Sequence, residues 1–156
     1  PNLVRPLKPR FFVFIDLYCF PYAPPHMSER LATRPVDGLR IRPRFVEGAW
    51  YVWAGCAFFD MAAVGDADLD FMPDPALRLD TAGGNWRRFY DRIDPARLDF
   101  LTSHGVPVAA LDGSRTYDFT GIGEAFMHIG GGSYRSGEEN RRQIEAARAF
   151  VESRLA

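Results

Sequence analysis

The segment "VPVAALDGSRTYDF" (106–119) constrains the fold of this chain more than any other stretch. Two apolar runs flank an Asp-Gly dipeptide at 112–113, and this arrangement is among the strongest short-range signals for a β-hairpin. A two-residue turn at the dipeptide would place Asp118 opposite Pro107. A three-residue loop with a glycine bulge would place Asp118 opposite Val106 instead. The two registers direct Asp118 to different faces of the sheet, and the two-residue turn is the favoured one.

The last twenty residues carry the most regular apolar pattern in the chain. Ser136 and Glu139 form a capping box, which is typical of a helix N-terminus. Apolar residues then recur at spacings of three and four, which predicts an amphipathic helix over about 137–155 docked on a core. The residues expected to dock are Ile144, Ala147, Phe150, Val151 and Leu155.

Shorter elements are predicted along the rest of the chain. The aromatic run 9–20 predicts one buried strand, and 39–61 predicts two strands around a turn near Glu47-Gly48. The remaining segments are short helices at 27–34, 85–93 and 95–105, a proline-rich connector at 21–26 and an acidic, turn-rich stretch at 63–75. This order predicts a single α+β domain over 1–156. We expect a mixed or antiparallel sheet of about five strands packed against helices, with a C-terminal amphipathic helix.

Composition narrows the classes of function. The net charge of −1 predicts no general attraction to nucleic acid or to an anionic membrane. No stretch approaches the roughly 18 apolar residues of a membrane span. Two cysteines are too few for a disulfide framework, and no signal-peptide pattern is visible, so we expect a cytoplasmic protein.

The charges are unevenly distributed along the chain. Residues 1–50 carry 8 Lys and Arg against 4 Asp and Glu, whereas residues 51–102 carry 5 against 9. Within the basic part, "RIRPR" places Arg40, Arg42 and Arg44 at alternate positions. We expect this basic strand to face acidic residues of the same chain, and nucleic acid to bind weakly or not at all.

A cysteine, a histidine and an aspartate form the first candidate site. A thiolate nucleophile needs a base within hydrogen-bond reach and a third group that orients the base. Cys56, His104 and Asp118 occur in that order along the chain. If the segment after Cys56 is helical, its dipole lowers the pKa of a thiol at its N-terminus. The alternative is that Cys56 is a small buried apolar residue, and a two-residue turn would separate His104 from Asp118.

The glycine-rich stretch "HIGGGSYRSGEEN" (128–140) is the second candidate site. It places His128, Ser133 and Arg135 before a predicted helix N-terminus, where backbone amides bind anions well. The pattern therefore indicates a phosphate- or carboxylate-binding site. The alternative is a flexible connector, because the two glutamates that follow already interact with the helix dipole.

Three aspartates form the third candidate. Asp66, Asp68 and Asp70 share one face if their segment is extended, and hard cations prefer such oxygen clusters. The spacing of an EF-hand loop is not met, so we predict neither a metal site nor a cofactor. The alternative is a solvated loop, or a partner for the basic strand.

Two classes of function fit these patterns. The first is a non-catalytic binding or assembly protein, such as an inhibitor, an immunity-type partner or a component of a larger particle. It would take a protein partner, because aromatic residues and arginine are enriched at interface hot spots. The second is a hydrolase or acyltransferase with Cys56 as nucleophile, His104 as base and Asp118 as the orienting group. The reactivity of the thiol distinguishes the two classes.

Overall fold

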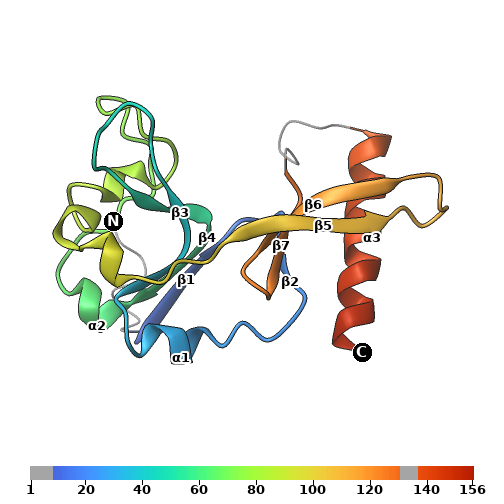
Figure 1. Ribbon diagram of the computed structural model, residues 1–156, viewed down its shortest axis with the longest axis horizontal. Helices are drawn as coiled ribbons and strands as arrows, with labels where there is room; N and C mark the ends of the chain where they lie inside the picture. The colour runs from blue at the N-terminus through green and yellow to red at the C-terminus, as the bar shows by residue number, and fades with distance from the viewer. Residues whose placement is uncertain (1–8, 131–136) are drawn as a thin grey trace. The chain divides into compact units, whose positions relative to one another are not determined.

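The chain is described by a computed structural model at residues 9–130 and 137–156, and it divides into two compact units. Unit 1 comprises Pro1–Ile15 and His26–Leu101, and unit 2 comprises Asp16–Pro25 and Thr102–Ala156. Each unit has one antiparallel sheet (Figure 1). Each also has its own hydrophobic core. The predicted α+β class is confirmed, but the described residues form seven strands in two sheets rather than about five in one.

The sheet of unit 1 is built around its longest strand. β4 (Tyr51–Asp60) lies between β1 (Phe11–Ile15) and β3 (Val36–Ile41), and both pairings are antiparallel. β4 takes the central place because its sequence "YVWAGCAFFD" is an almost continuous apolar run, which suits a strand buried on both faces. The predicted pair of strands within 39–61 is confirmed, with the turn at 47–48.

A β-bulge interrupts the pairing of β3 with β4. The register shifts between Gly38 and Arg40. Gly38 has φ of 140°, and a Cβ atom there would collide with the backbone carbonyl of Cys56, so only glycine fits.

A buried carboxylate lies next to this bulge. Asp37, whose side chain is fully buried, accepts hydrogen bonds from the guanidinium of Arg30 and from the backbone N–H of Gly38. Arg30 belongs to helix α1 (Met27–Leu31), so the ion pair fastens this short helix to β3. The same guanidinium donates to the backbone carbonyl of Asp99 at 3.0 Å. One buried charge therefore holds three segments of unit 1 together.

The segment from 65 to 100 contains only short turns of helix after α2 (Met61–Val64). The helix predicted over 85–93 is absent, and 3-10 turns occupy η2 (Gly83–Asn85) and η3 (Tyr90–Arg92). The helix predicted over 95–105 is also wrong, because only its first turn forms, as η4 (Pro95–Arg97). Gly105, the last residue of that predicted helix, lies inside a strand. Phe89 and Tyr90 of this segment are nonetheless buried in the core of unit 1. They pack from an irregular backbone instead of from one helix face.

Unit 2 has a four-stranded sheet in the order β2-β7-β6-β5. The strands are β2 (Cys19–Pro21), β5 (Ser103–Ala109), β6 (Thr116–Ile122) and β7 (Phe126–His128). The single strand predicted over 9–20 is thus wrong, because a turn at Asp16 divides it into β1 and β2, which join different sheets. The short strand β7 lies in a segment for which we predicted no strand.

The predicted hairpin is confirmed, with the predicted register and a longer loop. Asp118 pairs with Pro107, as a two-residue turn would require. The loop nevertheless spans 111–114, because the backbone N–H of Ala110 donates to the carbonyl of Arg115 at 2.9 Å. A type I′ turn would need positive φ at both central residues, and in this dipeptide only Gly113 has it.

Helix α3 (Glu138–Leu155) confirms the predicted C-terminal helix and packs against the β5–β6 hairpin (Figure 1). Ala146 and Ala147 are buried in the core of unit 2, and Phe150 packs edge-on against Tyr22. The N-cap is Gly137, and Ser136 of the predicted capping box lies outside the described residues. Leu155 does not dock as predicted, because it is 61% exposed.

The first prediction concerns the docking of α3. Phe150→Ala removes a half-buried ring and should cost about 2 kcal/mol, roughly half the loss for a fully buried phenylalanine. The melting temperature should fall by several degrees in thermal unfolding followed by circular dichroism. Leu155→Ala is the matched control and should change stability by less than about 0.5 kcal/mol. Equal losses in both variants would contradict this assignment of the docked face.

The second prediction concerns the buried ion pair. Arg30→Met leaves Asp37 buried without its main partner and should cost about 3 kcal/mol in chemical denaturation. Arg34→Met is the control, because its guanidinium lies 3.9 Å from the same carboxylate and should cost about 1 kcal/mol or less. If the two variants lose the same stability, the Arg30–Asp37 pair is not the main support of this region.

Candidate binding surface

Cys56 lies in the middle of β4 and is fully buried. The segment that follows is a strand up to Asp60, and α2 begins only at Met61, so no helix N-terminus faces the thiol. The condition that would lower the pKa of this thiol through a helix dipole is therefore not met. The position fits the alternative interpretation, in which Cys56 is a small apolar residue of a central strand.

His104 and Asp118 both belong to the β5–β6 hairpin but point away from each other. His104 is paired with Gly121, and its imidazole lies against the place that a side chain at Gly121 would occupy. Asp118 instead lies over Gly105, where an added Cβ would be 2.9 Å from its Oδ1. Since side chains alternate along a strand, the two residues are on opposite faces of the hairpin. Cys56 belongs to unit 1, whereas this pair belongs to unit 2.

The structure describes one residue of the predicted anion site. His128 ends β7 and is half-buried, and Ser133 and Arg135 lie outside the described residues. Burial lowers the pKa of the His128 imidazole, and the charge of Asp16 acts in the opposite direction.

The acidic segment contacts an arginine of its own unit. The guanidinium of Arg88 lies 3.5 Å from the carboxylate of Asp68 and 3.2 Å from that of Asp70. Asp70 also accepts a hydrogen bond from the backbone N–H of Met72, as expected in a tight turn. Within 9–130 and 137–156, no three His, Cys, Asp or Glu side chains converge in a way that could hold a metal ion.

The described arginines of unit 1 differ in their charged partners. Arg92 contacts its neighbour Asp91, and Arg10, Arg87 and Arg97 have no ion pair with a described acidic residue. Arg30, Arg34 and Arg88 form ion pairs with aspartates. The arginines of "RIRPR" form none with any acidic residue that the structure describes, and neither does Arg78. All 20 Asp and Glu of the chain lie in the described ranges. The prediction that the basic strand faces acids of its own chain is therefore wrong.

Two of these unpaired arginines, Arg40 and Arg78, lie on aromatic rings. The guanidinium carbon of Arg40 is 5.2 Å from the ring centre of Phe100, and that of Arg78 is 5.3 Å from the ring centre of Phe45. Phe45 itself is 68% exposed. Cation–π contacts of this kind hold a guanidinium in place without neutralising it. We call this set the arginine–aromatic surface; it comprises Arg40, Arg42, Arg44, Phe45, Arg78 and Phe100.

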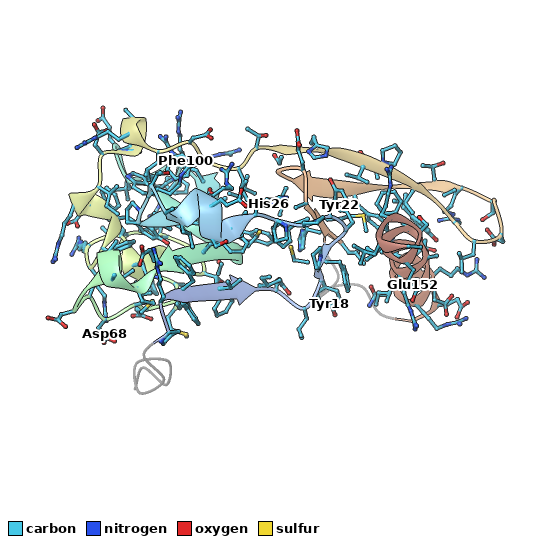
Figure 2. The ribbon with its side chains drawn as sticks, turned by 90° about the horizontal axis from the view of Figure 1, so that it is seen from below. Tyr18, Tyr22, His26, Asp68, Phe100 and Glu152 are labelled. Atoms are coloured by element: carbon cyan, nitrogen blue, oxygen red, sulfur yellow. The ribbon has the colours of Figure 1, made fainter. Side chains whose placement is uncertain are left out.

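Local structure explains how the surface forms. β3 ends at Ile41, and Pro43 cannot continue a ladder of backbone hydrogen bonds, so the chain leaves the sheet carrying the exposed Arg42 and Arg44. The connection returns at Trp50, which is buried against Tyr90 and Phe100. Figure 2 labels Phe100 within unit 1.

Desolvation acts on one arginine of this surface. The Nε atom of Arg40 is buried and has no hydrogen-bond partner among the residues that the structure describes. Burial, together with the nearby charge of Arg42, lowers the pKa of the Arg40 guanidinium. The charged form of Arg40 is thus less stable here than in water. An anion in contact with the guanidinium would stabilise the charged form and raise its pKa again.

Sequence reasoning identified only part of this surface. The alternation of Arg40, Arg42 and Arg44 was visible, although their partners were misjudged. Arg78 and Phe100 lie far from "RIRPR" in the sequence, and only the folding of segment 65–100 brings their side chains to it. No sequence pattern singled out Arg78; its place at the end of a short turn between Asp74 and Leu79 is known only from the structure.

No family model, curated protein or solved structure matches this chain.

None of the helices in the described part of the chain has the length and apolar character needed to cross a membrane.

The third prediction concerns the thiol of Cys56. A fully buried sulfur in a central strand reacts only when the strand opens, so alkylation should be orders of magnitude slower in the native protein than in denaturant. Mass spectrometry of peptides after timed treatment with iodoacetamide measures this, and buried Cys19 serves as an internal reference. Stoichiometric modification of native Cys56 near neutral pH would instead favour the cysteine hydrolase.

Proposed function

We propose that this chain is a non-catalytic binding protein and that the arginine–aromatic surface is its main contact with a partner. The observation that carries the proposal is the contrast within unit 1. Arg30, Arg34 and Arg88 are neutralised by aspartates. In the arginine–aromatic surface, by contrast, Arg40 and Arg78 lie on rings, and none of its arginines has an ion pair with an acidic residue that the structure describes.

The chemistry of the surface supports recognition rather than catalysis. Arginine and aromatic residues are enriched at the energetic centres of protein interfaces. A guanidinium presents several donors in one plane and holds carboxylate or phosphate groups through two hydrogen bonds. The six residues of the surface include no pair of nucleophile and general base. They provide positive charge, planar hydrogen-bond donors and one exposed ring.

The alternative, a hydrolase using Cys56, His104 and Asp118, has less support. The histidine and the aspartate leave the hairpin on opposite faces, so the aspartate is not placed to orient the imidazole. The thiol would also need access to substrate, and its side chain is fully buried. Stoichiometric alkylation of Cys56 in the native protein would favour the hydrolase over the binding function.

The fourth prediction tests the binding function with simple anionic probes. Hydrogen exchange by mass spectrometry should show slower exchange at 40–46 and 76–80 when polyglutamate, heparin or oligothymidylate is added at low salt. The effect should weaken as salt rises, because contacts between exposed charges are screened. The double variant Arg42→Ser/Arg44→Ser should lose most of the protection.

A charge-matched control separates this surface from a general effect of charge. Arg148→Ser/Arg154→Ser removes two positive charges from α3 of unit 2 and should keep the protection seen in the unmodified chain. Absence of protection with all three probes, or equal loss in both double variants, would overturn the proposal.

A further inference from the structure

The conformation of Arg78 is the first sign of what the arginine–aromatic surface recognises. Arg78 has φ of 54°, in the left-handed region that side chains other than glycine and asparagine seldom adopt. It closes a short loop in which Asp74 and Leu79 exchange backbone hydrogen bonds of 3.0 and 2.9 Å. Glycine would suit this position better for folding. Strain of this kind is a reason to look for a function of the side chain, and here its guanidinium carbon lies 5.3 Å from the ring centre of Phe45, which stays largely exposed.

The second sign is the incomplete set of partners around Arg40. Its Nε donor is buried and unsatisfied within the described residues, and its ring contact with Phe100 supplies no acceptor. A buried donor without an acceptor destabilises a fold. The buried Nε is closed to an incoming acceptor, so a partner's carboxylate would contact the terminal nitrogens of the guanidinium, which are not among the buried unsatisfied atoms.

We propose that the arginine–aromatic surface binds an acidic peptide segment of a protein partner, in which carboxylates at alternate positions flank an apolar side chain. This inference rests on the proposed binding function and adds the class of partner.

The spacing of the arginines supports an extended acidic segment. Arg42 precedes Pro43, which biases its backbone toward an extended conformation. Residues two apart along an extended chain are about 7 Å apart, so Arg40 and Arg42 match carboxylates at alternate positions of an extended peptide. Phe45 lies three residues beyond Arg42 and is largely exposed, which provides a place for an apolar side chain of the peptide.

The charge balance of unit 1 favours such a short segment over a nucleic acid. Pro1–Ile15 and His26–Leu101 together carry 13 Lys and Arg and 12 Asp and Glu. Asp74 and Asp80 are also close in sequence to Arg78, and Glu47 follows Phe45. Binding of nucleic acid draws on contacts with many successive phosphates, which these acids would repel. A small group of arginines beside an exposed ring suits a few carboxylates.

The fifth prediction is a competition between matched probes. Fluorescence anisotropy of a labelled peptide with alternating glutamates around one leucine should show saturable binding to the full chain. Replacing its glutamates by glutamines should weaken binding at least tenfold, and replacing its leucine by serine should weaken it severalfold. An oligothymidylate of equal charge should bind more weakly than the acidic peptide.

Variants of the chain assign the binding to this surface. Arg42→Ser/Arg44→Ser should abolish binding of the acidic peptide, while Arg148→Ser/Arg154→Ser leaves it unchanged. Arg78→Gly should relieve the backbone strain, so the melting temperature should stay the same or rise while the affinity falls severalfold. A residue with only a structural role would not show this combination.

The outcomes separate the inference from the proposed function. If oligothymidylate binds more tightly than the peptide and the Arg42→Ser/Arg44→Ser change abolishes that binding, the surface still binds partners but the acidic-peptide inference is overturned. If the peptide binds equally well to both double variants, the inference is also overturned. If no anionic probe binds, the proposed function falls together with it.

Discussion

The arrangement of unit 1 depends on the ion pair between the buried carboxylate of Asp37 and the guanidinium of Arg30. A charge in this position is costly unless it is paired and hydrogen-bonded, so the fold is held to the geometry that supplies its donors. Arg30 supplies one and also donates to the backbone carbonyl of Asp99, and the backbone N–H of Leu101 donates to the carbonyl of Gly38. Phe100 lies between these two anchored residues, which explains why its ring is available to Arg40.

The same unit therefore uses arginine in two ways. The hydrogen bond to Asp37 raises the pKa of Arg30, whereas burial without a counter-charge lowers the pKa of Arg40. Arginines paired with aspartates, such as Arg30, stabilise the fold. Arginines of the arginine–aromatic surface, such as Arg40, place positive charge where a partner could neutralise it. The binding function that we propose rests on this division of the arginines rather than on the net charge of −1.

The β5–β6 hairpin shows how strand register fixes the faces on which His104 and Asp118 lie. Loops of two and of four residues keep the same strand register, so the longer loop left the pairing of Asp118 with Pro107 unchanged. A three-residue loop would have moved Asp118 to the face of His104. The separation of these two side chains follows from register and alternation, without any reference to the reactivity of Cys56.

The sequence by itself determined the elements whose signals are local: the helix over 138–155, the hairpin at 112–113 and the strands on either side of the turn at 47–48. Tertiary packing decided the other elements. The spacing of apolar residues indicates which of them are buried, but it does not determine whether their backbone is a helix, a strand or an irregular turn. The segment 85–93 buries its aromatic residues from irregular turns, and the run 9–20 is divided by a turn at Asp16. The candidate surface was the least predictable feature, since contacts between residues distant in sequence depend on how the chain returns upon itself.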